Sequence, residues 1–447
     1  MSIKRINNLS GFPENLPEEQ IVEEQIKRLM RETYERYGYV PLETPAVENM
    51  ALLIPDSDNS DVGKEIYAIE RAAAEGESEK DSRRGLRYDL TVPLARYVAQ
   101  HYGQISFPFK RYQIQKVWRG ERPQKGRFRE FYQEDIDVVA EDKLPLHFDA
   151  EVIQVVHSIL RNIDLGPFTM HINHRKYLQG LLEQNGVDST NLEEALRIID
   201  KLDKVSVEKT AKDLCESTSI SLDQAKGLLK HLQKTVPIGE LDDYLANTDG
   251  EEGSLLEQGK AELKTIAALL ATTPDRVGKI DIKPSIARGL DYYTGCVYET
   301  TLDGLEQYGS ICSGGRYENL ANRFTKKKLP GVGISIGLSR LFAIIKEEGL
   351  LDFTRKSNVD VLVGLVSEEQ RLRANDIARV LRDNDIPTDV YFDGERQLGK
   401  QIKYATKQGT PYMLFLNDDG SIEMKDLEKH VQETHKNIQS VIASLKD

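Results

Sequence analysis

Hydrophobic positions near the start of the chain recur at helical spacing. Ile26, Met30 and Tyr34 are each four residues apart, with charged residues between them. This spacing predicts an amphipathic helix over Pro17–Tyr37 that ends at Gly38. Two prolines then favour an extended segment. A long helix before an extended segment indicates either an oligomerisation element or an ordinary surface helix.

Before residue 140 the pattern changes to strand, charged loop, strand. Lys110–Trp118 and Glu130–Val139 are rich in aromatic and β-branched residues, which predicts two strands. Between them, Arg119–Arg129 holds four arginines, one lysine and one glutamate, together with glycine and proline. The pattern therefore predicts a hairpin with a long basic loop.

The remaining chain predicts two further kinds of segment. Residues 174–276 are polar and mainly helical in pattern, which indicates an insertion within a first domain made up of 1–173 and 277–349. Residues 357–447 alternate strand and helix patterns and end with a predicted helix from about Leu427. This alternation predicts a small α/β domain around a largely parallel sheet.

Composition narrows the class of protein. With 447 residues, 39% of them hydrophobic, the chain has enough apolar material for about two to four folded domains. It shows no apolar signal core and no long apolar run, which disfavours secretion and a membrane span. Three widely spaced cysteines favour a reduced, cytoplasmic protein. The net charge of -13 argues against a non-specific nucleic-acid binder, so any RNA site must lie on a local basic face.

The basic loop indicates phosphate chemistry. Arginine binds phosphate oxygens through two hydrogen bonds at once and stabilises charge that develops during phosphoryl or nucleotidyl transfer. A fork of arginines beside Glu121 therefore suits a bent polyphosphate. A solvated charged loop explains the same composition, and both interpretations remain open at this point.

The strand after the loop indicates a polar pocket. Alternate residues of a strand share a face, so Phe131, Gln133, Asp135 and Asp137 point the same way. An aromatic ring, an amide and two acids make a poor core but suit a polar ligand. Upstream, Tyr88–Thr91 offers another acid and a hydroxyl, which are groups that hold an ammonium.

Two later segments also carry candidate chemistry. Ala287–Gly295 contains Arg288 after two apolar residues, followed by Tyr292 and Tyr293. An arginine in an apolar run usually pairs with a carboxylate or a bound anion, so a structural ion pair and a ligand contact are both open. Gly331–Leu341 is a glycine-spaced strand that enters a helix, which permits close approach of a backbone or a ligand.

A basic stripe is predicted in the last domain. Arg396, Lys400, Lys403 and Lys407 recur at spacings of four, three and four, which places them on one face of a helix. Such a stripe suits an RNA backbone, and an ordinary solvated face explains it equally well. None of the eight histidines has metal-ligand spacing, so no protein-held metal is expected.

These segments, in this order, resemble class II aminoacyl-tRNA synthetases and specifically the histidyl-tRNA synthetase family. Arg119–Arg129 resembles the motif 2 loop of that family, Ala287–Gly295 its histidine-specific motif, and Gly331–Leu341 its motif 3. The helix that ends near Tyr37 resembles motif 1, and Leu398–Ala405 resembles part of the anticodon-binding domain.

The resemblance implies a fold and a reaction. The fold is an α+β catalytic domain with an antiparallel sheet flanked by helices, divided by a mainly helical insertion and followed by a C-terminal α/β anticodon-binding domain. In the reaction, histidine and ATP give histidyl-adenylate and pyrophosphate, and the histidyl group then passes to the 3′ end of tRNA(His). Mg²⁺ is expected with ATP, and a homodimer is expected for the protein.

The resemblance also implies roles for particular residues. Arg119 and Arg288 would be catalytic and neutralise charge at the α-phosphate from opposite sides, while Phe131 and Arg340 would lie on the two faces of adenine. The implied ATP site comprises Arg119, Glu121, Arg127, Phe131 and Arg340. The implied histidine site comprises Asp89, Thr91, Arg119, Gln133, Asp137, Arg288, Tyr292 and Tyr293.

Contacts to tRNA follow from the same resemblance. Arg122 and Gln124 in the motif 2 loop would approach the acceptor end, and the basic stripe would serve the anticodon-binding domain. Asp89 and Asp137 stand where many bacterial relatives have glutamate, which is longer by one methylene. The alternatives are catalytically silent relatives: a regulatory subunit of ATP phosphoribosyltransferase, which lacks the C-terminal domain, and a tRNA sensor. The motif arginines favour an active enzyme.

Overall fold

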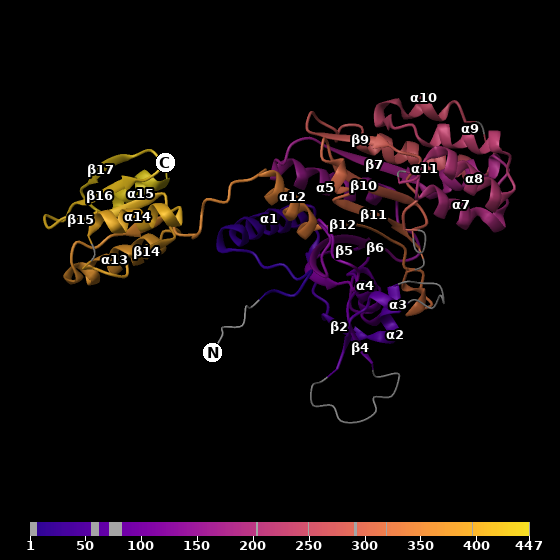
Figure 1. The fold of residues 1–447 in the computed structure, drawn as a ribbon. Helices are drawn as coiled ribbons and strands as arrows, with labels where there is room; N and C mark the ends of the chain where they lie inside the picture. The colour runs from indigo at the N-terminus through magenta and orange to yellow at the C-terminus, as the bar shows by residue number, and fades with distance from the viewer. Residues whose placement is uncertain are drawn as a thin grey trace. The chain divides into compact units, whose positions relative to one another are not determined.

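The structure is a computed structural model that describes residues 7–54, 62–70, 83–202, 204–248, 250–289, 293–318, 320–395 and 397–446 (Figure 1). The chain forms two compact units. The large unit consists of residues 1–13 and 27–350, and the small unit of residues 14–26 and 351–447. No helix in the described ranges has the length and hydropathy that crossing a bilayer requires.

A nine-stranded sheet is the framework of the large unit. In spatial order its strands are β1 (Val40–Pro41), β5 (Phe109–Trp118), β6 (Glu130–Val139), β12 (Gly331–Ile336), β11 (Cys312–Tyr317), β10 (Cys296–Leu302), β7 (Phe168–His174), β9 (Gly278–Ile282) and β8 (Val236–Pro237). The run from β5 to β7 is antiparallel throughout, whereas β1 pairs with β5, and β9 with β7, in parallel. The predicted hairpin is confirmed as β5 and β6.

Helices flank this sheet, as predicted (Figure 1). They include α1 (Pro17–Arg36), α4 (Thr91–Gln100), α5 (His147–Ile163) and α12 (Leu338–Glu348). α5 packs on β12 and β7 through Val152, Val156 and Ile159, which helical spacing places on one buried face. In α1, the buried Tyr34 stacks on Tyr112 of β5 with ring centroids 5.3 Å apart, which fixes the first predicted helix to the hairpin.

A minor sheet lies beside the main one in the large unit. It consists of β2 (Val47–Asn49), β4 (Arg84–Leu86) and β3 (Ala68–Ile69), with the short helices α2 (Met50–Leu53) and α3 (Val62–Glu65). Arg87 follows β4, is buried, and donates to the Thr44 carbonyl at 2.6 Å and to Gln115 at 2.7 Å. This arginine therefore ties the segment after α1 to β5.

The stretch between β7 and β9 is mainly helical, as predicted. Its helices are α6 (Arg175–Gln184), α7 (Leu192–Ile199), α8 (Val207–Thr218), α9 (Leu222–Leu232), α10 (Leu241–Leu245) and α11 (Leu255–Leu270). Gly180 of α6 and Gly259 of α11 let these two helices approach closely, because a Cβ at either position would overlap backbone of the other helix.

The small unit has a mixed five-stranded sheet between helices. Its strands in spatial order are β14 (Thr388–Val390), β13 (Val361–Val363), β15 (Tyr412–Leu416), β16 (Ile422–Asp426) and β17 (Val431–His435), and its helices are α13 (Arg371–Arg382), α14 (Leu398–Gln408) and α15 (Ile438–Lys446). The predicted α/β alternation is confirmed as far as β15.

Two expectations for the small unit are wrong. The sheet is not largely parallel, because only β13 pairs in parallel with β14 and β15, whereas β15–β16 and β16–β17 are antiparallel. The helix predicted from about Leu427 begins only at Ile438, since a turn with His430 at φ +57° returns the chain as β17. Every residue of β17 is at least partly exposed, so this strand lacks the apolar alternation that would have revealed it.

Candidate functional site

One face of β6 carries the candidate site. Antiparallel pairing sets Asp135 between Gln113 of β5 and Ser335 of β12, and sets Asp137 between Arg111 and Gly333. Alternation then directs the polar residues of β6 to the same side of the sheet. The structure brings together the four residues predicted to share this face, but it divides them between two adjoining hollows.

The larger hollow, here called the large cleft, has a volume of about 640 Å³, part of which is open to solvent. Its walls come from the loop between β5 and β6, from β6 itself, from the start of β11, and from the junction of β12 with α12. The lining residues are Arg119, Glu121, Gly126, Arg127, Phe128, Phe131, Gln133, Ser310, Ile311, Cys312, Ser313, Ser335, Gly337 and Arg340.

Arginines dominate the charge of the large cleft. The guanidinium of Arg119 lies 4.3 Å from the Tyr88 ring and 5.1 Å from the Phe131 ring. Across the cleft, Arg340 donates to the carbonyls of Gly126 and Ser310 at 3.2 and 2.7 Å. Burial lowers the pKa of Arg340, and the neighbouring arginines lower it further. Cations gathered in this way favour a bound anion.

Glu121 and Arg127 form an ion pair of 3.3 Å at the mouth of the large cleft. The turn between them is held by mutual backbone hydrogen bonds of Gln124 and Arg127, with Gly126 at φ +68°. All five residues predicted to bind ATP therefore line the large cleft. Gln124, which was predicted to approach the acceptor end of tRNA, is exposed to solvent.

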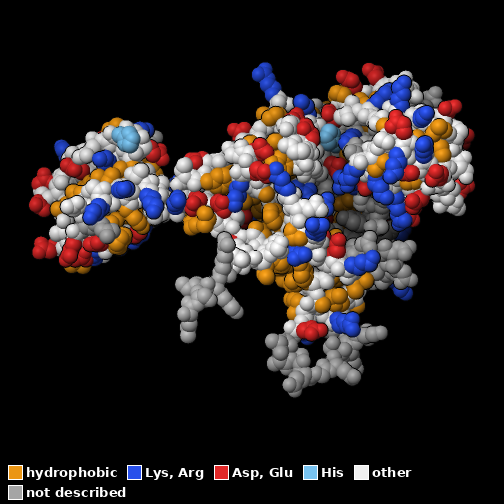
Figure 2. Space-filling model, in the orientation of Figure 1, with side chains coloured by type: hydrophobic (Ala, Val, Ile, Leu, Met, Phe, Trp, Pro, Cys, Tyr) orange, Lys and Arg blue, Asp and Glu red, His pale blue; other side chains and the backbone are white. Residues whose placement is uncertain are grey.

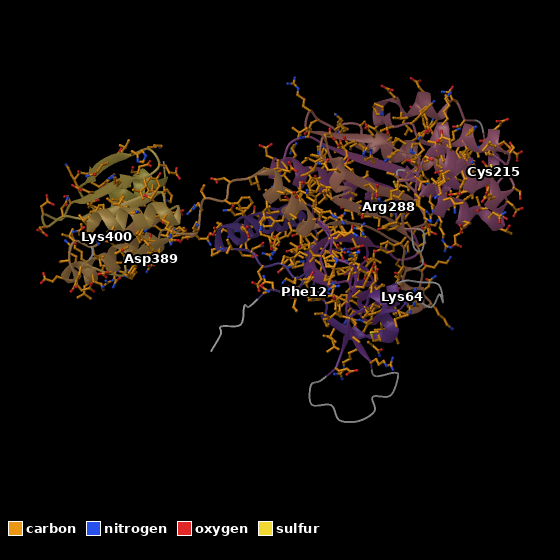
Figure 3. All side chains as sticks on the ribbon, in the orientation of Figure 1. Phe12, Lys64, Cys215, Arg288, Asp389 and Lys400 are labelled. Atoms are coloured by element: carbon orange, nitrogen blue, oxygen red, sulfur yellow. The ribbon has the colours of Figure 1, made fainter. Side chains whose placement is uncertain are left out.

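Arg288 lies in the connection between β9 and β10 (Figure 3). Its half-exposed side chain forms an ion pair with Glu299 of β10, and its charge contributes to the lowered pKa of Arg340. The ion pair with a carboxylate, one of the two interpretations that the sequence left open for Arg288, is thus present. Figure 2 shows Lys and Arg side chains gathered on this face of the large unit.

The smaller hollow, here called the small pocket, adjoins the large cleft at Ser335. Its lining residues are Thr91, Asp135, Asp137, Tyr293, Tyr317, Gly333, Ile334 and Ser335. Burial raises the pKa of Asp135 to about 6 and that of Asp137 to about 7, although the nearby Arg111 lowers both. The small pocket therefore concentrates carboxylates where the large cleft concentrates arginines.

Glycines make room for the polar side chains of the small pocket. A Cβ on Gly333 would overlap the carboxylate of Asp137, and one on Gly315 would lie 2.8 Å from the Tyr293 ring. Gly289 has φ +68°, and a Cβ there would also overlap Tyr293. Gly333 thus fits the close approach expected from the sequence for Gly331–Leu341.

The residues predicted to hold an ammonium lie at the start of α4. Asp89 accepts a hydrogen bond from the backbone of Val92 at 3.0 Å, and burial raises its pKa. Thr91 lines the small pocket. Gln133 lines the large cleft and donates a hydrogen bond of 2.9 Å to the hydroxyl of Ser335. Tyr292, predicted to contact histidine, lies outside the described residues.

Several site residues were not predicted from the sequence. Arg111 is fully buried and forms a 2.6 Å ion pair with Asp137, which also accepts a 2.9 Å hydrogen bond from Tyr317. Ser335 and Glu299 were missed as well. Arg111 did carry a signal, since it alternates with Gln113 and Gln115 in a strand rich in aromatic and β-branched residues.

The lysines of the predicted basic stripe are placed as expected on α14 of the small unit. Lys400, Lys403 and Lys407 are exposed (Lys400 is labelled in Figure 3), while Gln401 on the opposite side is buried and hydrogen-bonds the backbone of Leu365. Arg396 lies outside the described residues. Among the residues described, no group of three or more His, Cys, Asp or Glu could hold a metal ion.

Comparisons with known proteins point to one family. The family description "Histidyl-tRNA synthetase" matches residues 11–341, and "Anticodon binding domain" matches residues 360–447. A histidine–tRNA ligase of Thermobifida fusca is 44% identical over 427 residues, covering 95% of each chain, and one of Xylella fastidiosa is 41% identical over 440 residues, covering 94% of each. The crystal structure of histidyl-tRNA synthetase from Nostoc sp. PCC 7120 matches with a TM-score of 0.88 and 34% identity over 99% of each chain.

Proposed function

We propose how the residues of the site divide the work, from the premise that this chain belongs to the histidyl-tRNA synthetase family. It is a class II ligase that activates histidine with ATP and transfers it to tRNA. In the first step a carboxylate oxygen of histidine attacks the α-phosphorus and pyrophosphate leaves. In the second, a hydroxyl at the 3′ end of tRNA attacks the carbonyl carbon and AMP leaves. The observation that carries the proposal is an arginine-lined cleft that adjoins a carboxylate-lined pocket along β6.

ATP occupies the large cleft in this proposal. Phe131 and Arg340 sandwich adenine, because the ring and the guanidinium both line the cleft and both stack on flat π surfaces. Arg127 contacts the terminal phosphates. Glu121, a carboxylate that lines the cleft, would hold a Mg²⁺ ion bound with ATP. Such an ion would supply further positive charge at the departing pyrophosphate.

Arg119 and Arg288 act at the α-phosphate. Arg119 is already oriented between two aromatic rings, and it also meets the histidine carboxylate that attacks. In the free enzyme, the ion pair with Glu299 holds the side chain of Arg288 in position. When ATP binds, Arg288 leaves Glu299 and contacts the α-phosphate instead. Catalysis then comes from positioning and charge stabilisation without a covalent enzyme intermediate.

Histidine extends from the large cleft into the small pocket. Its carboxylate must lie near the α-phosphate, so its side chain points away from the arginines, towards Asp137 and Tyr293, with Tyr292 as a further contact. Asp89, Thr91 and Gln133 contact the α-amino group. Buried polar groups of this kind discriminate strongly, because an analogue that lacks the imidazole N–H leaves them unsatisfied.

tRNA contacts involve both units. Arg122 and Gln124 are exposed on the motif 2 loop and approach the acceptor end. In the small unit, Lys400, Lys403 and Lys407, with Arg396, bind the RNA backbone of the anticodon region. We further assign 1–173 and 277–349 to the catalytic domain, 174–276 to its insertion and 357–447 to the anticodon-binding domain.

The proposal also covers the oligomeric state and the cellular location of the enzyme. A homodimer is expected from the family. A cytoplasmic location fits Cys215, Cys296 and Cys312, all of which are free thiols. A purely regulatory role is not favoured, since residues 360–447 match an anticodon-binding domain.

ATP–pyrophosphate exchange with each amino acid in turn tests this function. Exchange should require histidine, and the same preparation should charge tRNA(His). Exchange with a different amino acid, or no exchange with any, would contradict the proposal.

A further inference from the structure

The segment that leads to Arg288 is buried but irregular. Residues 284–287 follow β9, lie outside the helices and strands, and are all buried. Buried backbone of this kind needs hydrogen-bond partners for its carbonyls, because an unsatisfied polar group away from water is costly. Two side chains at the boundary of β7 and α6 supply these partners, namely Asn173 and Arg175.

Asn173 holds the first part of the segment. Its side chain is fully buried, and its amide nitrogen donates to the carbonyls of Pro284 and Ile286 at 2.8 Å each. The backbone adds a further bond, since the N–H of Lys283 donates to the carbonyl of Ile172 at 2.9 Å. The end of β7 therefore fixes the path of the chain from Lys283 to Ile286.

Arg175 acts one residue nearer to Arg288. It is buried, and its guanidinium donates to the carbonyl of Ala287 at 3.0 Å. This carbonyl belongs to the peptide group that joins Ala287 to Arg288. Because a peptide group is planar, a bond that holds its oxygen also restricts the nitrogen and the Cα of Arg288.

The chain is held on the far side of Arg288 as well. The carbonyl of Gly289 accepts the backbone N–H of Tyr293 at 2.9 Å, and the carbonyl of Gly295 accepts the backbone N–H of Arg175 at 2.9 Å. Arg175 thus bonds the chain both before and after Arg288, with its side chain and with its backbone. The backbone of Arg288 is framed, while its half-exposed side chain pairs with Glu299.

We propose that Asn173 and Arg175 are positioning residues for Arg288. Neither contacts a substrate in this proposal; they hold the backbone from which Arg288 reaches the α-phosphate. The inference rests on the proposed function, since it takes Arg288 to act there. Accurate placement matters because a misplacement of about 1 Å at a reacting group costs on the order of 10²-fold in rate.

The proposal also links the insertion to the chemistry. Arg175 is the first residue of α6, with which the insertion begins. Helix α6 packs closely on α11, because Gly180 and Gly259 leave room for the facing backbone. The insertion therefore anchors the residue that frames Arg288.

A double-mutant cycle in ATP–pyrophosphate exchange tests the proposal with wild type, Arg175→Met, Arg288→Ala and the double variant. Methionine has a similar length but no donors, so Arg175→Met should lower kcat roughly 10- to 100-fold. In the Arg288→Ala background the same change should alter kcat by less than about twofold. A residue that acts through another loses its effect once the other is removed, whereas a general loss of structure lowers kcat in both backgrounds.

Two further variants serve as controls. Lys176 is the next residue of α6 and forms an ion pair of 2.5 Å with Glu262 of α11, so Lys176→Met removes the same charge from the same turn. It should leave kcat within about twofold of wild type. Arg175→Lys keeps a charged donor, and its kcat should lie between those of wild type and Arg175→Met.

Three results would overturn the proposal: unchanged exchange in Arg175→Met, an equal loss in both backgrounds, or an equal loss in Lys176→Met. If Arg175→Met shows no cooperative thermal unfolding, Arg175→Lys takes its place in the cycle, and its smaller loss should also vanish in the Arg288→Ala background. Failure of the proposed function is distinguishable, because the wild type itself would then show no histidine-dependent exchange.

Discussion

The large cleft and the small pocket lie on the same strand, β6, yet they use charge in opposite ways. The cleft presents arginines that stack on aromatic rings or bond backbone carbonyls and have few carboxylates among them. The pocket presents buried carboxylates, one of which pairs with the buried guanidinium of Arg111. One face of a single strand can thus present side chains to an anionic ligand group and, a few residues further on, to a ligand group that donates hydrogen bonds. Under the proposed function, the phosphates of ATP would meet the arginines and the N–H donors of histidine would meet the carboxylates.

The largest effect should come from removing a cation of the phosphate site. Arg288→Ala should lower the rate of ATP–pyrophosphate exchange by about 10²- to 10³-fold, because one preorganised charge at a developing oxyanion is worth that much. Histidine binding measured by calorimetry should remain. Unchanged exchange would mean that Arg288 serves only its ion pair with Glu299.

The next effect concerns the buried guanidinium of Arg111, which pairs with Asp137 of the small pocket. Arg111→Met should destabilise the fold by about 3 kcal/mol, since removing one member of a buried ion pair leaves the other uncompensated. Thermal unfolding measures the loss. Adding Asp137→Asn to Arg111→Met should recover part of it, and a double variant no more stable than the single one would show that the pair is not coupled.

The raised pKa of Asp135 gives a prediction for pH. A carboxyl with a folded pKa of about 6 and an unfolded value near 3.8 binds more protons when folded, so its contribution to stability falls as pH rises from about 4 to 6. Asp135→Asn should therefore stabilise the protein at pH 8 by on the order of 3 kcal/mol. Near pH 4 the two melting temperatures should converge. A variant that is less stable than the wild type at pH 8 would contradict this sign.

The smallest effect is expected far from the chemistry. Lys400→Glu with Lys403→Glu should raise the KM for tRNA roughly tenfold and leave ATP–pyrophosphate exchange unchanged, because exposed lysines bind the RNA backbone through screened charge. Added salt should reduce the difference between wild type and variant. Equal aminoacylation by both proteins would mark the stripe as an ordinary solvated face.

Local patterns predicted the hairpin and one face of the site. Phe131, Gln133, Asp135 and Asp137 follow from strand alternation alone, and the loop between the strands follows from its glycine, proline and charge. The partners across the sheet did not follow, because pairing of Asp137 with Arg111 and Gly333 depends on register between strands far apart in sequence. That register also gives Asp135 and Asp137 different partners across the sheet.

The end of the chain shows a different limit. The strand β17 is exposed along its whole length and packs little apolar surface, so its polar sequence resembles that of a surface helix. Its position is determined by antiparallel pairing with β16 and by the turn at His430. Propensity and periodicity therefore failed where backbone pairing, rather than side-chain burial, specifies the element.

The contrast between the two hollows is tested most directly by one crossed titration. ATP and L-histidine are each titrated calorimetrically into the wild type, Arg340→Ala and Asp135→Asn. Arg340→Ala should weaken ATP binding about tenfold or more and leave the Kd for histidine within twofold, whereas Asp135→Asn should do the reverse. Two variants that weaken both ligands equally would contradict the account, because cleft and pocket would then act as a single site.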